Sequence, residues 1–184
     1  MGIIKLELTD YLQPIFDSVF KDILDEEYLT PELFLKKNWF KYKEHIKKNK
    51  VNNNQPGKVF EFFFEIILSN EKVKVYSKDS NVEGVPFVKP DFLIKKNDGN
   101  FIFISLKTSL RERWKQADWE AIKFKEKYHL SDCYLITLNE VEIKSLKNKI
   151  SKGQLKGGLD AAYFGLSSDL NDLIEIVKES QVKF

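Results

Sequence analysis

The sequence of 184 residues contains little cysteine and little histidine: one cysteine, Cys133, and two histidines, His45 and His129. None of the three has a second cysteine or histidine at the spacing that zinc sites use. This excludes zinc fingers, histidine-metal nucleases and disulfide scaffolds. We interpret all three residues as structural, because no adjacent partner suggests a nucleophile.

Long apolar runs are also absent, and none approaches the ~18 residues that a membrane span needs. The N-terminus lacks the basic region and apolar stretch of a signal peptide, and Leu6 stands where a myristoylation signal has Ser or Thr. We therefore expect a cytoplasmic protein that makes no membrane contact.

An excess of charge of one sign is missing too, since 30 Lys and Arg face 28 Asp and Glu for a formal net charge of +2. A role with nucleic acid would therefore depend on where the lysines cluster. With 42% hydrophobic residues and no repeats, the chain is typical of one globular domain over 1–184. Within it we distinguish N-terminal helices with a basic, amide-rich loop (1–56), a core (57–138) and a C-terminal part (139–184).

Hydrophobic periodicity predicts both helices and strands. The predicted helices begin at Thr9-Asp10 and Thr30-Pro31, cover 57–70 and 112–129, lie within the lysine-rich segment 144–158, and begin again at Ser168. The predicted strands are 73–77, 90–96, 100–107, 133–138 and 161–166. This order predicts an α/β fold with a mixed central sheet flanked by helices on both faces.

A hairpin around Asn97-Asp98-Gly99 places three polar residues at one end of the sheet. Asp91 begins its first strand, and Ser105 and Lys107 end its second. Because a short turn folds the two strands back on each other, we expect Asp91 and Lys107 to be neighbours. An isolated pair of this kind is more often a structural ion pair than a catalytic one.

Glutamates on two helices are candidates for the same site. The helical phase puts Glu120 beside Gln116, at the border of the apolar stripe and able to project toward the sheet. Glu61 and Glu65 share one face of the otherwise apolar helix 57–70, where an unpaired carboxylate would cost several kcal/mol. Taken singly, each glutamate could instead make a buried structural hydrogen bond.

Together these residues resemble the PD-(D/E)XK nuclease superfamily. Pro90-Asp91 followed by Ser105-Leu106-Lys107 is similar to its motif, except that Ser105 replaces the second acid. The EcoRII- and NgoMIV-like branch of type II restriction endonucleases takes this acid from the following helix, and Glu120 stands thirteen residues after Lys107, as in that branch. The run 57–61, GKVFE, also resembles the start of the superfamily's active-site helix, which favours Glu61 over Glu65.

The resemblance implies a site-specific, double-stranded DNA endonuclease that leaves 5′-phosphate and 3′-hydroxyl ends. Asp91 and Glu120, with Glu61 beside them or through water, would hold Mg²⁺, which prefers oxygen ligands. Lys107 would orient the attacking water, and Ser105 would occupy the position of the missing acid. A homodimer would present two sites to a palindrome, with a tetramer equally open. Trp119 points away from the apolar stripe of its helix and could pack at a subunit interface. A cognate DNA methyltransferase would be encoded nearby without being a stable partner.

Basic and amide side chains near these positions are candidates for DNA binding, although any one lysine could equally belong to a solvated face. Arg pairs well with guanine, and Asn or Gln with adenine. The candidates are Arg111, Arg113, Lys115, Gln116, Asn53, Asn54, Gln55, Lys58, Lys152 and Lys156.

Two other hypotheses remain open at this point. A repair or phage-defence nuclease could recognise DNA structure or modification with the same residues. A non-catalytic DNA-binding protein would use Asp91 and Lys107 as a structural pair, with Ser105 marking lost chemistry.

Overall fold

Five strands form one mixed sheet in the order β1-β2-β3-β4-β5 in the computed structural model, which describes residues 13–49 and 56–181. The first three strands are antiparallel neighbours, and β3, β4 and β5 run parallel. The strands are β1 (Val75–Lys78), β2 (Phe92–Lys95), β3 (Phe101–Lys107), β4 (Asp132–Thr137) and β5 (Ala161–Phe164). The predicted α/β fold with β3 as a central strand is therefore confirmed.

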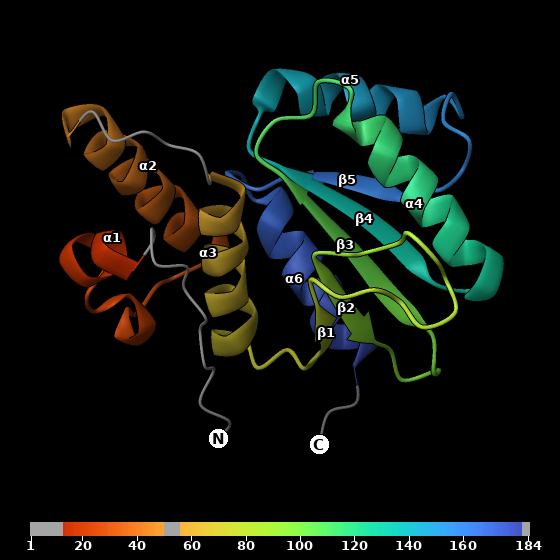
Figure 1. Ribbon diagram of the computed structural model, residues 1–184, viewed down its shortest axis with the longest axis horizontal. Helices are drawn as coiled ribbons and strands as arrows, with labels where there is room; N and C mark the ends of the chain where they lie inside the picture. Colours follow the sequence, from red (N-terminus) through yellow and green to blue (C-terminus); the bar gives the residue numbers. More distant parts are fainter. Residues whose placement is uncertain (1–12, 50–55, 182–184) are drawn as a thin grey trace.

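Helices cover both faces of this sheet (Figure 1). One face packs against α3 and α6, and the other packs against α4 and α5. The helices are α1 (Gln13–Val19), α2 (Pro31–Asn49), α3 (Pro56–Asn70), α4 (Arg113–Lys127), α5 (Glu140–Ser151) and α6 (Asp169–Ser180), with a 3₁₀ turn, η1 (Ile23–Asp25). In the part of the chain that the structure describes, no helix is long and apolar enough to cross a membrane.

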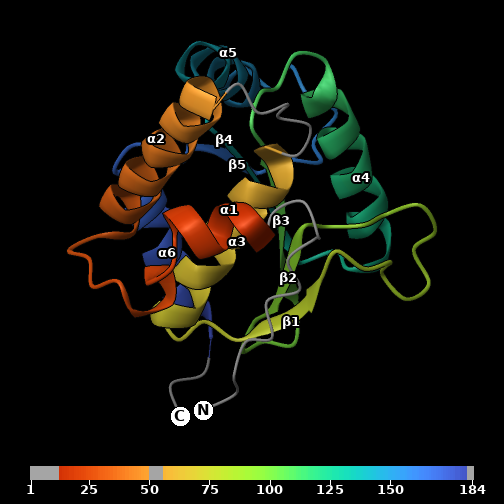
Figure 2. The same ribbon diagram turned by 60° about the vertical axis from the view of Figure 1, so that its left-hand side comes forward.

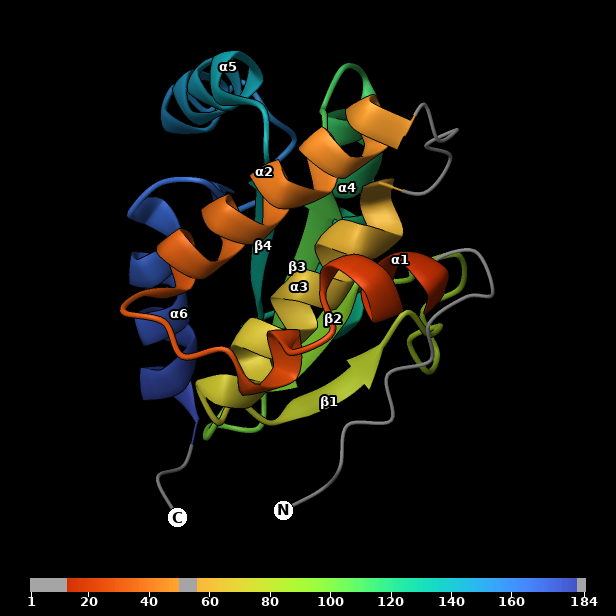
Figure 3. The same cartoon turned by 90° about the vertical axis from the view of Figure 1, so that its left-hand side faces the viewer.

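Aromatic residues of α3 form the centre of the larger core. Phe60, Phe63 and Phe64 are fully buried between the sheet and the N-terminal helices. Figure 2 shows α1 lying against α3, where the rings of Phe16 and Phe62 are 4.1 Å apart between centroids. Figure 3 shows α2 and α3 in front of the sheet on the same side. The apolar composition of α3, which predicted a buried helix, therefore organises the whole of this face.

Alternation along β3 divides its side chains between the two cores as predicted. Ile102 and Ile104 face α3, whereas Phe101 and Phe103 face α4. Gly99 closes the turn at φ +85°, a conformation that favours glycine. Because Phe92 pairs with Ile104, the residue before β2 lies beside the end of β3. The hairpin thus sets the register on which the polar end of the sheet depends.

Several predicted element boundaries differ from the structure by one or more residues, and two of these differences have a clear physical reason. The first strand begins at Val75 rather than residue 73, because the turn that follows α3 still holds Val73: its N–H donates to the carbonyl of Leu68, and its side chain is buried. Helix α5 begins before the predicted segment 144–158, at Glu140, where the side chain of Asn139 accepts from two backbone N–H groups. Some expectations lie outside the described residues, namely the helix start at Thr9-Asp10 and the loop residues Asn53, Asn54 and Gln55.

Asp118 of α4 holds the segment that enters β5. Its carboxylate accepts hydrogen bonds from the backbone N–H groups of Lys156, Gly158 and Leu159 at 3.0–3.3 Å. A Cβ atom on Gly158 would lie 2.1 Å from the carbonyl oxygen of Asp118, so this close approach requires glycine. The buried carboxylate therefore accepts backbone hydrogen bonds that, within a sheet, a neighbouring strand would accept.

We expect Asp118→Ala to lower the free energy of unfolding by about 3 kcal/mol, because buried N–H groups would lose their acceptor. Urea denaturation measures this loss. Asp98→Ala is the control: Asp98 is exposed, accepts one backbone hydrogen bond and lies 3.5 Å from Nζ of Lys96, so its loss should leave the free energy of unfolding nearly unchanged. Equal effects of the two substitutions would contradict the anchoring role of Asp118.

Candidate active site

Asp91 and Lys107 meet at the end of the hairpin, as the sequence predicted. Oδ2 of Asp91 accepts a hydrogen bond of 2.6 Å from the backbone N–H of Leu106 and lies 3.4 Å from Nζ of Lys107. The backbone carbonyl of Asp91 accepts from the N–H of Asp79, where β1 ends. Both side chains of the pair are less than one-fifth exposed. Asp91 is therefore fixed by two strands.

Glu120, on α4, interacts electrostatically with this pair. It is buried, with 8% of its surface exposed, and its Oε1 accepts a 2.7 Å hydrogen bond from Nε2 of Gln116. Burial raises the pKa of Glu120; Gln116 and the charge of Lys107 lower it, and the charge of Asp91 raises it further. These interactions place Glu120 within electrostatic reach of both Asp91 and Lys107.

The connection between Lys107 and α4 is itself anchored. The carboxylate of Glu142, on α5, accepts hydrogen bonds from the backbone N–H groups of Leu110 at 2.6 Å and Arg111 at 3.0 Å. Arg111 has a φ of +40°, an unusual conformation for a residue with a side chain. This anchoring fixes the position of α4, and hence of Glu120, relative to the end of β3.

The structure separates the two glutamates of α3. Glu65 pairs with Lys78 of β1. Glu61 is nearer the site: burial raises its pKa, a hydrogen bond from Lys58 lowers it, and the charge of Asp91 raises it. Glu61, rather than Glu65, is therefore the carboxylate of this helix that interacts with Asp91.

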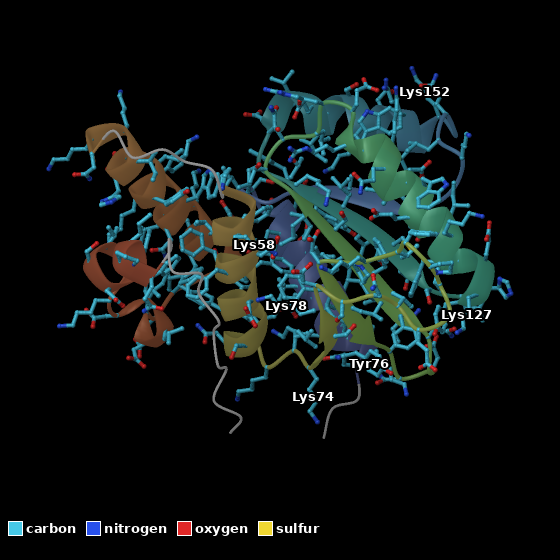
Figure 4. The ribbon with its side chains drawn as sticks, viewed as in Figure 1. Lys58, Lys74, Tyr76, Lys78, Lys127 and Lys152 are labelled. Carbon is cyan, nitrogen blue, oxygen red and sulfur yellow. The ribbon has the colours of Figure 1, made fainter. Side chains whose placement is uncertain are left out.

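Lys58 and Asp79 form an ion-pair network that local sequence did not predict. Nζ of Lys58 lies 2.7 Å from Oε2 of Glu61 and 3.0 Å from Oδ2 of Asp79. The other oxygen of Asp79 lies 2.9 Å from Nζ of Lys89, two residues before Asp91. Figure 4 shows Lys58 on the side of α3 that faces the sheet. This network joins the helix that carries Glu61 to the segment that carries Asp91.

Ser105 lies on β3, two residues before Lys107, and is not hydrogen-bonded to the charged residues of the site. The residue is 1% exposed, and its hydroxyl makes no hydrogen bond with the described residues. It shares the α4-facing side of β3 with Phe103, as alternation predicted.

Cys133 lies on the next strand, β4, and is fully buried. Burial raises the pKa of its thiol to about 12, so it is no nucleophile at neutral pH.

The oxygen atoms here suit a hard divalent cation. Within residues 13–49 and 56–181, no three Asp, Glu, His or Cys side chains lie close enough together to hold a metal ion by themselves. Mg²⁺ commonly binds through one or two carboxylates, with water and substrate phosphate completing its ligands. Oδ1 of Asp91 and Oε2 of Glu120 accept no hydrogen bond from the described part of the chain. Asp91 and Glu120 therefore fit this ion as a two-carboxylate donor set.

The DNA-binding candidates are distributed unevenly. Lys58 forms ion pairs with two acidic residues, and the amide of Gln116 donates a hydrogen bond to Glu120. Lys152 lies at the end of α5, far from Lys58 (Figure 4). The other described candidates, Arg111, Arg113, Lys115, Lys152 and Lys156, are also exposed, while Asn53, Asn54 and Gln55 lie outside the described residues.

In the presence of a chelator, we expect Glu120→Gln to raise the free energy of unfolding at neutral pH. The raised pKa of Glu120 means that the native state binds its proton more tightly than the unfolded state does. Above its native pKa, the charged carboxylate therefore lowers the free energy of unfolding. This destabilisation disappears as the pH falls toward the pKa that Glu120 has in the unfolded state. Gln cannot ionise and keeps an oxygen for the amide of Gln116.

Urea denaturation between pH 4 and pH 7 measures this effect. The gain should be largest at pH 7 and shrink toward zero near about pH 4. A variant that is equally destabilised at both pH values would show that Glu120 makes a structural contact instead.

The fold is restriction-endonuclease-like, because its mixed five-stranded sheet with helices on both faces matches that of a solved restriction endonuclease. The restriction endonuclease PspGI in complex with substrate DNA is similar with a TM-score of 0.58 and 20% identity, over 94% of this chain and 81% of that chain. Metal-depleted Ecl18kI, in complex with uncleaved, modified DNA, matches with a TM-score of 0.44 and 18% identity, over 95% and 65% of the two chains. No protein-family model and no curated protein matches the sequence.

Proposed function

We propose that this protein is a Mg²⁺-dependent, site-specific endonuclease for double-stranded DNA, of the type II restriction class, which leaves 5′-phosphate and 3′-hydroxyl ends. The observation that carries the proposal is the convergence of Asp91, Lys107 and Glu120 at one end of β3, on a restriction-endonuclease-like fold. PspGI was solved with its substrate DNA, and this supports DNA as the partner here.

Each residue has a distinct role in this proposal. Asp91 and Glu120 would hold Mg²⁺, with Glu61 beside them or through water. When bound, Mg²⁺ offsets the charge of the phosphate and lowers the pKa of a bound water. Lys107 orients the attacking water or contacts a phosphate oxygen, and it stabilises the charge that develops in the transition state. Its 3.4 Å contact with Asp91 is long for a hydrogen bond, which leaves ammonium protons for the substrate.

DNA would be held by the exposed basic residues that flank this end of the sheet. Arg111 and Arg113 stand between Lys107 and Glu120 in sequence, so they can contact phosphates or base edges near the scissile bond. Substituting a phosphate-binding residue lowers affinity for all sequences alike, whereas substituting a base-contacting residue relaxes specificity at one position. Binding assays with Arg111→Ala and Arg113→Ala on varied DNA sequences separate these two roles.

Cutting both strands requires two active sites, and we propose that a symmetric homodimer supplies them. Trp119 is 44% exposed and lies next to Glu120 in α4, where a second copy could cover it. Sedimentation of the wild-type protein and of Trp119→Ala tests this arrangement. A wild-type monomer that stays monomeric on DNA would contradict it.

Ser105 favours a second candidate, a DNA-binding protein without nuclease activity, because it stands where the superfamily has an acid. Sequencing the ends cut from unmethylated and methylated DNA distinguishes the hypotheses. A single recurring site that methylation protects supports the restriction class. Cleavage that requires modified or structured DNA indicates a repair or phage-defence nuclease, and intact DNA in every condition supports the binding protein.

A further inference from the structure

Glu120 depends on one neighbour for its orientation. Nε2 of Gln116, one turn earlier in α4, donates the 2.7 Å hydrogen bond that Oε1 of Glu120 accepts. In the described part of the chain this is the one hydrogen bond that the carboxylate makes. Residues four apart lie on the same face of a helix, so the contact follows directly from the helical geometry.

This hydrogen bond distinguishes the two oxygen atoms of Glu120. Oε1 is occupied by the amide, whereas Oε2 makes no hydrogen bond with the described residues. A glutamate side chain has several rotamers of similar energy, and a hydrogen bond to one oxygen restricts the direction of the other. Two charged groups act on the pKa of this carboxylate: Lys107 lowers it and Asp91 raises it.

We propose that Gln116 is a positioning residue: its amide fixes Glu120 so that Oε2 remains available to a divalent cation shared with Asp91. This inference rests on the proposed nuclease function. Groups that orient metal ligands typically affect metal affinity or activity by 10–100-fold when they are removed. Gln116 is itself exposed, so its substitution leaves the core unchanged.

The same geometry argues against Gln116 as a base contact. A glutamine that recognises adenine uses its amide nitrogen and oxygen together. In the structure the amide nitrogen is already used by Glu120, and DNA would have to break that bond. The positioning role and the DNA-contact role therefore predict different measurements.

The test uses Gln116→Met, which keeps an unbranched side chain with good helix propensity and removes the donor. Mn²⁺ binding to the free protein by titration calorimetry should weaken by about 10–100-fold. The Mg²⁺ concentration for half-maximal cleavage should rise by a similar factor, with the rate recovering at saturating Mg²⁺. DNA affinity in chelator, the position of the cuts and the melting temperature should stay as in the wild type.

Gln13→Met is the matched control, because Nε2 of Gln13 donates an equivalent 2.8 Å bond to Oδ1 of Asp17 at the same spacing, at an exposed position of α1. It should change none of these quantities. Unchanged metal dependence in Gln116→Met, or lost DNA affinity in chelator, would overturn the positioning role while leaving the nuclease proposal intact. A wild-type protein that neither binds Mn²⁺ nor cleaves DNA would overturn both.

Discussion

Lys107→Ala is expected to reduce DNA cleavage by about 10²–10³-fold while leaving folding and DNA binding intact. The loss has this size because the ammonium acts on charge that develops in the transition state, where removing one such donor costs 10²–10³ in rate. Binding of uncleaved DNA depends mainly on phosphate contacts elsewhere, so it should change little. Single-turnover cleavage and binding in chelator, with the same protein preparation, measure the two effects.

Lys96→Ala provides the matched control for Lys107→Ala. Nζ of Lys96 lies 2.9 Å from Asp132, and its side chain is 17% exposed against 19% for Lys107. The Lys96→Ala substitution therefore removes a lysine from a comparable ion pair at the other end of the β2–β3 hairpin. If both substitutions lower only the melting temperature and no cleavage exists to lose, the Asp91–Lys107 pair is structural.

Glu120→Ala is expected to be far more damaging than Ser105→Ala. Removing a metal ligand should cost about 10²–10³-fold in cleavage, since charge stabilisation by a metal amounts to several kcal/mol. Ser105→Ala should cost less than about tenfold, because its hydroxyl makes no hydrogen bond with the described residues. Cleavage rates at saturating Mg²⁺ measure both effects.

The comparison tests whether the second acid of the site has moved to α4. Circular dichroism and thermal melting confirm that each variant is folded, which matters because both residues are buried. Equal losses in the two variants would contradict the proposed position of the acid on α4.

Local patterns were sufficient to predict that Asp91 and Lys107 are neighbours and on which side of its helix Glu120 lies. The Asn97-Asp98-Gly99 turn fixed the hairpin register, and the register placed Asp91 beside Lys107. Helical phase indicated which side of α4 Glu120 occupies, and the buried position of Glu120 agrees. Turn chemistry and periodicity act over a few residues, so a single sequence is enough to reveal them.

The surroundings of the site depend on contacts between distant segments. That Lys58 binds DNA stays a prediction. One of its two acidic partners, Asp79, is 21 residues away and directly follows β1. No local pattern indicates that pairing. By contrast, the contact between Gln116 and Glu120 follows the i, i+4 rule, so the sequence contained the signal that would have assigned it.

Strand β1 shows the same limit in the fold. Its predicted start at residue 73 follows a clean alternation of apolar and polar residues. Lys72, at φ +59°, lies in the turn that follows α3, and Val73 after it is instead buried in the hydrophobic core around α3. Tertiary packing thus overrides a local strand preference at this position.

Incubation of the purified protein with unmethylated plasmid and phage DNA, with Mg²⁺ or with chelator, tests whether it is a Mg²⁺-dependent, site-specific endonuclease. Discrete DNA fragments should appear with Mg²⁺ and be absent with chelator and in the Lys107→Ala variant. Intact DNA across all substrates and methylation states, from a protein that is folded and binds DNA, would contradict this proposed function.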